Sequence, residues 1–450
     1  MSDYTPELLL PAGSLKHMRY AFAYGADAVY AGLPRYSLRV RNNEFNLENL
    51  KIGIDEAHAL GKKFFVTVNI MPHNSKLKTF LKDMQEVIDL KPDALIMADP
   101  GLIHMVHKNW PEMEIHLSVQ ANTVNYASAQ FWQEAAGVSR VILSRELSLE
   151  EVGDIKKHCP DLELEVFVHG SLCIAYSGRC LLSGYFNHRD PNQGTCTNSC
   201  RWSYDVHKAK EDEQSGIVPE KQVVELQGPT GEIRSKESED VYLIEEANRP
   251  GELMPIEEDE HGTYIMNSKD LRAVEHVRDL IEMKIDCLKV EGRTKSHYYV
   301  ARTAQSYRKA IDDAMSGKEF DPSLIGTLDN LANRGYTDGF FKRHHSQEYQ
   351  NYMDSHSRNR QQQFCAEVLA FENGVGTFLS KNKIRLGDSI EVVTPEGNYD
   401  IIIESLISEK GESLEEIKGG GVTFQMPIER IHPSLGLLAR NLADEEEILT

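Results

Sequence analysis

Residues 8–32 read LLLPAGSLKHMRYAFAYGADAVYAG and set the pattern for the chain. A short apolar run at Leu8–Leu10 is followed by a helix-like stretch from Leu15 to Tyr24, and Gly25 ends that stretch. A second apolar run follows at Ala28–Tyr30. Short apolar strands that alternate with helices are typical of parallel strands that are buried on both faces. The opening of the chain therefore predicts a β/α fold.

The strand–helix unit recurs until about residue 170 and returns once near residue 288. The further apolar runs are Phe64–Ile70, Ala94–Met97, Ile115–Val119, Val141–Leu143, Leu162–Val168 and Ile285–Val290. Eight runs match the strand count of a closed β/α barrel, and a doubly wound open sheet is the alternative. A nucleotide-binding open sheet would carry G-x-G-x-x-G after its first strand, which PAGSLK does not match. We therefore predict a (β/α)8 TIM-like barrel over residues 1–345.

Polar residues follow the predicted strands, at the end where a β/α barrel keeps its chemistry. His169 is the best general acid–base candidate by residue type, and Glu291 is a second catalytic candidate after the last strand. The alternative for His169 is a ring that is hydrogen-bonded at the strand end. Some of the other strand-end residues are expected to be helix caps or ion pairs. The other strand-end residues are Asn69, Asp99, Gln120, Arg145 and Glu146.

Four of the seven cysteines lie within 28 residues, shortly after His169. They are Cys173, Cys180, Cys196 and Cys200, with the spacing C-x6-C-x15-C-x3-C. Four thiolates from one loop can bind an iron–sulfur cluster or a zinc ion, and disulfides are a third option. Zinc sites favour C-x2-C pairs, which this sequence lacks, so the long spacing favours an iron–sulfur cluster.

The chain is acidic, with 70 acidic and 49 basic residues and a formal net charge of −21. This balance argues against nucleic-acid binding by bulk charge, although a local basic surface is compatible with it. No secretory signal and no run of 18 apolar residues is present, so we expect a cytoplasmic protein without a membrane span, in a compartment where disulfides are rare. Basic residues gather in Arg35–Arg41 and in Arg334–Arg360. In the second stretch Arg334, Lys342 and Arg343 are candidate RNA contacts, with a solvated face as the alternative.

The sequence also predicts how the chain divides. Residues 171–262 interrupt the barrel as an insertion that begins with the cysteines, and Lys208–Gln214 within it is predicted to be an exposed loop. Residues 346–363 are a predicted linker. From residue 364 to 450, short apolar runs alternate with turn signals such as Glu372-Asn373-Gly374, which predicts a small C-terminal antiparallel β-barrel domain. Such a domain can bind RNA, and a purely structural role is equally open.

The cysteine segment also matches a family signature. The pattern E-x-F-x-x-G-[SA]-x-C-x4-G-x-C-x-x-S, which runs from Glu165 to Ser183, resembles the signature of the collagenase-like U peptidases, family 32. The similarity continues in PAGSLKHMRYAFAYGADAVYAG, VILSRELSLEE, CTNSCRW, MNSKDLRA and KVEGRTKSHYY, so it covers nearly the whole chain. These segments resemble the tRNA-modifying members of the family.

The resemblance implies an iron–sulfur enzyme that hydroxylates carbon 5 of the wobble uridine in tRNA. Its product would be 5-hydroxyuridine, the precursor of 5-methoxyuridine and 5-carboxymethoxyuridine. It further implies that the four clustered cysteines together hold the cluster, expected to be [4Fe–4S], and that prephenate is a co-substrate.

Prephenate is a dicarboxylate, and guanidinium groups bind carboxylates through paired hydrogen bonds. Four arginines follow predicted strands two, six and eight, and two amide side chains lie at neighbouring strand ends. We therefore expect these six residues to bind the substrates: Arg39, Arg41, Asn69, Gln120, Arg145 and Arg293.

A peptidase is the least favoured function. The sequence has no H-E-x-x-H or G-x-S-x-G motif, and a His169–Cys173 pair would leave the other three clustered thiols unused. Hydroxylation of another RNA base or of a small aromatic molecule stays open, as does a non-enzymatic iron–sulfur carrier. The sequence does not indicate an oligomeric state.

Overall fold

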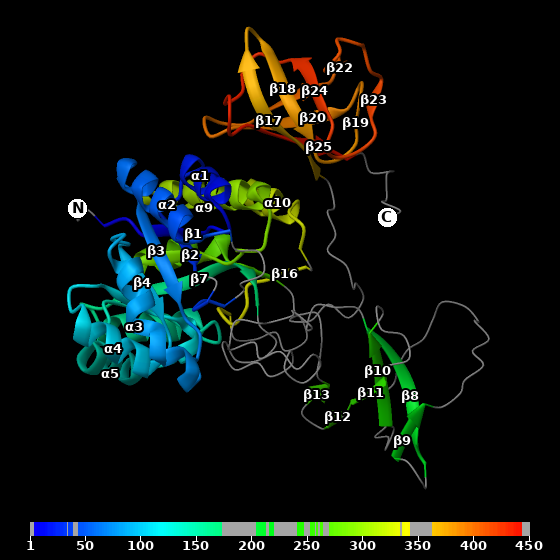
Figure 1. Ribbon diagram of the computed structural model, residues 1–450. Coiled ribbons are helices and arrows are strands. Elements are labelled where there is room, and N and C mark those ends of the chain that lie inside the picture. Colours follow the sequence, from blue (N-terminus) through cyan, green and yellow to red (C-terminus); the bar gives the residue numbers. More distant parts are fainter. Residues whose placement is uncertain are drawn as a thin grey trace.

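The computed structural model describes residues 4–33, 35–38, 44–172, 270–333, 335–342 and 362–442, together with the backbone of six short strands between residues 204 and 263. The barrel strands are β1 (Glu7–Pro11), β2 (Ala28–Gly32), β3 (Lys63–Val68), β4 (Ala94–Met97), β5 (Ile115–Leu117), β6 (Arg140–Ile142), β7 (Glu163–Ser171) and β15 (Cys287–Val290). They run parallel, each paired with its neighbour in chain order (Figure 1). Because β15 pairs with both β7 and β1, the sheet closes on itself. The predicted β/α barrel is confirmed, and the open sheet is excluded.

Helices cover the outside of the barrel. They are α1 (Leu15–Ala23), α2 (Leu47–Ala59), α3 (Asn74–Ile88), α4 (Pro100–Asn109), α5 (Tyr126–Ala136), α6 (Leu149–His158), α8 (Val277–Glu282), α9 (His297–Met315) and α10 (Ser323–Asp329), with 3-10 turns η2 (Val119–Ala121) and η5 (Val274–His276). Asp99 caps α4 by accepting a 2.8 Å hydrogen bond from the backbone N–H of Leu102, so this strand-end carboxylate is a helix cap. Ser148 and Glu151 form a capping box at the start of α6. No helix among the described residues is long and apolar enough to cross a membrane.

The end of β7 extends past the barrel and forms part of its rim. There it pairs antiparallel with β14 (Asp270–Arg272), which pairs in turn with β16 (Tyr336–Thr337). β14 has a charged residue at each end and β16 has only two residues, so neither forms an apolar run and the sequence did not indicate them. Leu172, which follows β7, is buried and is the last described residue before the cysteine segment.

The insertion contains an antiparallel sheet. Its strands are β8 (Tyr204–Asp212), β9 (Gly216–Pro219), β10 (Val241–Glu246) and β11 (Leu253–Ile256), and a separate ribbon joins β12 (Glu258–Asp259) to β13 (Gly262–Thr263). The prediction of a loop over Lys208–Gln214 is therefore wrong as far as Asp212. Pairing of β8 with β9 on one side and β10 on the other outweighs the low strand propensity of its charged residues.

The C-terminal domain is an antiparallel half-barrel. Its sheet follows the order β21 (Tyr399–Ile402), β20 (Ser389–Val393), β25 (Leu437–Asn441), β17 (Gln362–Glu372), β18 (Val375–Ser380), β24 (Thr423–Pro427) and β22 (Ile407–Ser408), and β19 (Ile384–Arg385) pairs with β23 (Glu416–Ile417). The predicted antiparallel β domain is confirmed. Its separate core includes Phe378 and Phe424, whose rings stack at 5.4 Å. The last two residues of the predicted linker, Gln362 and Gln363, already belong to β17, and the rest of it lies outside the described residues.

The half-barrel packs on α1 and α9, on the outside of the barrel (Figure 1). The Tyr24 hydroxyl donates to the carbonyls of Val393 at 3.0 Å and Leu435 at 2.9 Å. Arg302 of α9 donates through both Nη atoms to the carboxylate of Glu391, at 3.0 and 2.9 Å. A partly buried, two-pronged ion pair of this kind helps to fix the relative orientation of the two domains.

Candidate active site

The structure describes only part of the predicted site. The four clustered cysteines, Arg39, Arg41, Arg334 and Arg343 lie outside the described residues. Six other predicted residues lie at the carboxyl-terminal ends of the barrel strands, which is the expected position in a β/α barrel: Asn69, Gln120, Arg145, His169, Glu291 and Arg293. Lys342, a predicted RNA contact, follows the short strand β16.

Asn69 and Arg293 both contact the backbone of Leu38, the residue that precedes Arg39. Asn69 Oδ1 accepts a 3.2 Å hydrogen bond from the backbone N–H of Leu38. Arg293 donates to the Leu38 carbonyl at 2.5 Å and to the hydroxyls of Ser37 and Thr67 at 3.4 and 3.3 Å. These two side chains therefore hold Leu38 at the mouth of the barrel, and Arg39 is the next residue.

Gln120 lies beside Asn69 at the ends of β5 and β3. The Ser118 hydroxyl accepts from the Asn69 amide at 3.4 Å and from the backbone N–H of Gln120 at 3.5 Å. The side chain of Gln120 is buried, and its Oε1 has no hydrogen-bond partner among the described residues. A buried oxygen in this state costs free energy unless a ligand or another part of the chain donates to it. This position therefore fits a substrate contact.

Arg145 and Glu291 form an ion pair at the mouth. Arg145 Nη2 donates to Glu291 Oε2 at 3.3 Å, and their side chains are only 7% and 10% exposed. The Arg145 guanidinium carbon lies 3.7 Å from the centre of the Phe167 ring, within cation–π range. Since Glu291 balances the charge of Arg145, this arginine is a weaker anchor for a free dianion than the sequence predicts.

Two aromatic rings inside the barrel each face a mouth arginine and one interior lysine. Tyr30 lies 5.9 Å from the Arg293 guanidinium, and Phe167 lies close to Arg145. Lys289 Nζ lies 4.3 Å from the centre of the Tyr30 ring and 5.4 Å from that of Phe167. The aromatic floor of the mouth is therefore bordered by three cations.

Lys289 is held by Glu165, and sequence reasoning did not assign either residue to the site. Lys289 Nζ donates to Glu165 Oε1 at 2.7 Å, and both side chains are buried. Burial raises the pKa of Glu165, but Lys289 and Arg140 outweigh burial and keep this pKa below its usual range. The signal was available in the sequence, because each is a charged residue between two apolar residues of its strand.

His169 faces away from the barrel interior. Phe167 pairs with Lys289, but the next residue of β15, Val290, pairs with His169, so the register shifts by one residue. A bulge of this kind re-aims the side chains that follow it. Since residues paired in register point to the same side, His169 shares the outer face with Val290 and packs against α9.

Each ring nitrogen of His169 contacts the hydroxyl of a different tyrosine. The Tyr307 hydroxyl donates to the carbonyl of the preceding residue, Val168, at 2.7 Å, so its oxygen is left to accept from His169 Nδ1 at 3.3 Å. His169 Nε2, 3.4 Å from the Tyr336 hydroxyl, then accepts from it. Burial, aided by nearby Lys295 and Arg272, lowers the pKa of His169 to about 3. The catalytic role of His169 stays a prediction, and these surroundings favour the structural alternative.

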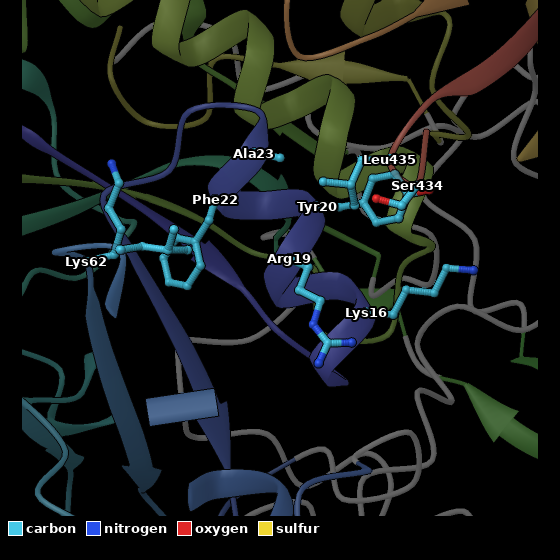
Figure 2. Close-up of a pocket in the computed structure, with 9 residues that line it drawn as sticks. Lys16, Arg19, Tyr20, Phe22, Ala23, Lys62, Ser434 and Leu435 are labelled. Carbon is cyan, nitrogen blue, oxygen red and sulfur yellow. The ribbon is translucent and has the colours of Figure 1, made fainter. Parts of the chain in front are cut away.

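A larger hollow lies outside the barrel, between α1 and the C-terminal domain (Figure 2). Its volume is about 560 Å³, and it is lined in part by the cations Lys16, Arg19 and Lys62. Each of them has a carboxylate partner, at 2.5 Å for Lys16–Glu367, 2.6 Å for Arg19–Glu56 and 3.2 Å for Lys62–Asp27. With its positive charge balanced, this hollow is a weaker candidate for an anionic substrate than the barrel mouth.

Comparison with known proteins gives matches along nearly the whole chain. Residues 13–351 match the peptidase family U32, and residues 360–440 match the C-terminal domain of that family. The tRNA hydroxylation protein P of Escherichia coli is 58% identical over 446 residues, which cover 98% of each chain. The protein of the same name from Haemophilus influenzae is also 58% identical, over 98% of each chain. The tRNA hydroxylation protein P1 of Bacillus subtilis is 34% identical, over 91% of this chain and 89% of its own.

Proposed function

Because this chain belongs to the peptidase family U32, and both of its domains align with relatives named for tRNA hydroxylation, we propose that it hydroxylates a tRNA base. The observation that carries the proposal is similarity over almost the full length of both chains. The finer proposal is hydroxylation of carbon 5 of the wobble uridine, with prephenate as co-substrate, in the cytoplasm. Its product would be 5-hydroxyuridine.

Nucleoside analysis tests this proposal directly. tRNA from a strain without this protein is expected to lack 5-hydroxyuridine and its 5-methoxy or 5-carboxymethoxy derivatives, and the intact gene is expected to restore them. Normal levels of these nucleosides in the deletion strain would exclude the proposed reaction. Normal levels would instead favour the function of a non-enzymatic iron–sulfur carrier, because a carrier is expected to release its cluster and to leave the tRNA nucleosides unchanged.

The four clustered cysteines would hold the iron–sulfur cluster. Their donor set fits this cofactor, because four thiolates are the usual ligands of such clusters. The segment that carries them begins directly after Leu172, at the rim of the barrel. When bound there, a cluster would supply one-electron chemistry near the mouth.

Metal content tests the ligand assignment. After anaerobic purification, the wild-type protein is expected to contain iron and sulfide, and Cys180→Ala is expected to lose most of both. Cys159→Ala is the matched control, because Cys159 is a buried thiol whose Sγ lies 3.7 Å from the Tyr126 carbonyl, away from the mouth. Full iron content in Cys180→Ala would show that the ligand assignment is wrong.

Prephenate would bind at the mouth, near Leu38. In this proposal Asn69 and Arg293 position Leu38, so that Arg39 and Arg41 reach a carboxylate, while Gln120 supplies an amide. Of the two catalytic candidates, Glu291 lies at the mouth and His169 does not, so we assign acid–base work to Glu291.

Two genetic backgrounds and one variant test the prephenate site. Cells blocked before prephenate synthesis are expected to lack the modified nucleosides, and cells blocked just after it are expected to keep them. Arg39→Ala is expected to weaken prephenate binding by roughly 30- to 1,000-fold, the usual effect of losing one partner of a paired carboxylate contact, while iron content is unchanged. Full modification without prephenate would end this part of the proposal.

The basic stretch with Arg334, Lys342 and Arg343 would contact the tRNA backbone. Lys342 is 60% exposed, and its Nζ lies 3.8 Å from the Asp338 carboxylate, which leaves it accessible to phosphate. Changing Lys342 and Arg343 together to Glu is expected to weaken tRNA binding and to flatten its salt dependence, because fewer counterions are released. Unchanged affinity with an unchanged slope would move the RNA contact elsewhere.

A peptidase gains no support from the site. A cysteine peptidase needs a histidine that accepts a proton from its thiol. His169 is the histidine nearest in sequence to Cys173, and both of its ring nitrogens already contact tyrosine hydroxyls.

A further inference from the structure

A short ribbon of the C-terminal domain carries a cluster of positive charge. Its strands β19 and β23 pair antiparallel, with Ile384 opposite Ile417, and both isoleucines are buried in the core of the half-barrel. Since side chains alternate between the two faces of a strand, the neighbouring Lys383 and Lys418 lie on the outer face. This face is basic, although the whole chain has a formal net charge of −21.

One carboxylate on the outer face is shared by three cations. Glu416 Oε2 lies 3.3 Å from Lys383 Nζ and 3.5 Å from Arg385 Nε. Glu416 Oε1 lies 3.9 Å from Lys418 Nζ, and the Lys418 side chain is 87% exposed. Within the part of the chain that the structure describes, neither lysine has a second acidic partner at ion-pair distance. Like charges that meet across paired strands are destabilising, so this cluster favours a polyanionic partner.

Three glycines follow Lys418, and the first of them has no steric need to be glycine. Gly421 adopts a φ of 87°, and a Cβ at Gly420 would lie 2.9 Å from the Lys381 carbonyl oxygen, so both positions favour glycine. Gly419 meets neither condition, because its φ is not positive and a Cβ there would have nothing within 4 Å. The missing side chain leaves open space beside Lys418, where an RNA backbone has room to approach.

The loop that carries these glycines is held by Ser380, which is buried. The Ser380 hydroxyl donates to the Gly419 carbonyl at 2.6 Å and accepts from the backbone N–H of Val422 at 3.0 Å. The Ser380 carbonyl accepts from the backbone N–H of Gly421 at 2.8 Å. The loop is therefore ordered before a partner arrives, which lowers the entropic cost of binding.

The ribbon and the barrel rim lie on the same side of the molecule. In Figure 1, β19 and β23 lie at the right of the half-barrel, and β16 lies at the right of the barrel. β16 belongs to the rim and precedes Lys342, the proposed RNA contact. An RNA that enters the barrel mouth past Lys342 therefore has a path along the C-terminal domain to the ribbon.

We propose that the outer face of the β19–β23 ribbon binds the phosphate backbone of tRNA, through Lys383 and Lys418 beside the open position at Gly419. This inference rests on the proposed function, because it names a second contact for the same RNA. Phosphate contacts position a nucleic acid and do not read its sequence. The ribbon therefore contributes affinity for tRNA in general and no choice among tRNAs.

Binding of a tRNA transcript to the full-length holoprotein at several salt concentrations tests the lysines. Loss of two phosphate contacts lowers the slope of log Kd against log salt concentration by roughly 2, so Lys383→Gln/Lys418→Gln is expected to bind more weakly and with a slope reduced by that amount. Lys51→Gln/Lys108→Gln is the matched control, because it removes the same charge from exposed lysines of the outer helices α2 and α4. It is expected to keep the wild-type slope.

A second variant tests the open position without a change of charge. Gly419→Gln fills the space beside Lys418 and is expected to raise Kd for the same transcript several-fold. Since neither the backbone nor the packing requires glycine at this position, its thermal unfolding temperature is expected to equal or exceed that of the wild type. Weaker binding by a fully stable protein would show that access to the ribbon is what matters.

The outcomes separate this inference from the proposed function. A wild-type Kd in either the lysine variant or Gly419→Gln would show that tRNA does not contact the ribbon, and the inference would be wrong while the nucleoside analysis still supports tRNA hydroxylation. A wild-type protein that neither binds the transcript nor restores the modified nucleosides would instead overturn the proposed function, and the inference with it.

Discussion

At the scale of single residues, one bulge decides what His169 can do. The shift between Lys289 and Val290 turns His169 out of the barrel and against Tyr307 and Tyr336. Burial then lowers its pKa to about 3, so the ring is neutral at physiological pH. The unfolded chain, by contrast, would protonate His169 below about pH 6.5.

This difference predicts a specific loss of stability in acid. Because the folded-state pKa is depressed, the contribution of His169 is complete above about pH 6.5 and is lost as the pH falls toward about 3. Between pH 7.5 and pH 5, the wild type is expected to lose about 2 kcal/mol more of its free energy of unfolding than His169→Gln. Urea unfolding at both pH values measures this.

The control for this comparison is His104→Gln, since His104 is an exposed residue of α4. It is expected to follow the wild-type pH dependence. An identical pH dependence in His169→Gln and wild type would mean that His169 is protonated in the fold, and would return it to the list of acid–base candidates.

At the scale of elements, β7 and β15 share a charged pair in a largely apolar barrel. Glu165 and Lys289 lie on adjacent strands and bond at 2.7 Å, with Arg140 of β6 at 3.4 Å from the same carboxylate. Buried pairs of this kind contribute little net stability, but the loss of one partner leaves a buried charge. Lys289 of this pair also lies over the rings of Tyr30 and Phe167, which form the floor of the mouth.

Lys289→Met is expected to lower the free energy of unfolding by about 3–5 kcal/mol, because Glu165 loses its nearest cation. The double variant Glu165→Leu/Lys289→Met is expected to recover part of that loss, as thermal or urea unfolding would show. Lys51→Met, which breaks the exposed Lys51–Asp55 pair, is the control and is expected to cost less than about 1 kcal/mol. Additive losses in the double variant would show that the two residues do not act as a pair.

At the scale of the whole molecule, the two domains share packing as well as ion pairs. Val393, Leu437 and Ala439 of the half-barrel belong to the main core of the barrel. Glu367 receives Lys16 and His297 from the barrel. Burial raises the pKa of Glu367, but hydrogen bonds from His297, Lys16 and Lys381 outweigh it and hold this pKa well below its usual range. These contacts predict that the domains unfold together.

Arg302→Ala is expected to separate the unfolding of the C-terminal domain from that of the barrel. The change leaves Glu391 without its two-pronged partner at the interface and is expected to cost about 3 kcal/mol. Calorimetry should then resolve a separate, earlier transition for the C-terminal domain. Lys309→Ala, on the same helix but paired only with aspartates of the barrel domain, is the control. One cooperative transition at the wild-type temperature in Arg302→Ala would contradict this prediction.

The sequence by itself determined the barrel strands and most helices. Apolar runs of three to seven residues, separated by amphipathic stretches and glycines, are legible within short windows, because strand and helix periods are local properties. The clustering of four cysteines and the arginines near strand ends was visible in the same way. The site residues Asn69, Gln120, Arg145, Glu291 and Arg293 were therefore placed at the correct end of the barrel from sequence alone.

Only the tertiary structure decided how those residues meet. Leu38, Asn69 and Arg293 are far apart in the chain, and closure of the barrel between β1 and β15 brings them together. The bulge that redirects His169 depends on the register of β7 against β15, more than 100 residues later, and no local pattern encodes it. Contacts between distant segments depend on how the strands pair, and strand pairing is a property of the closed sheet rather than of any one stretch of sequence.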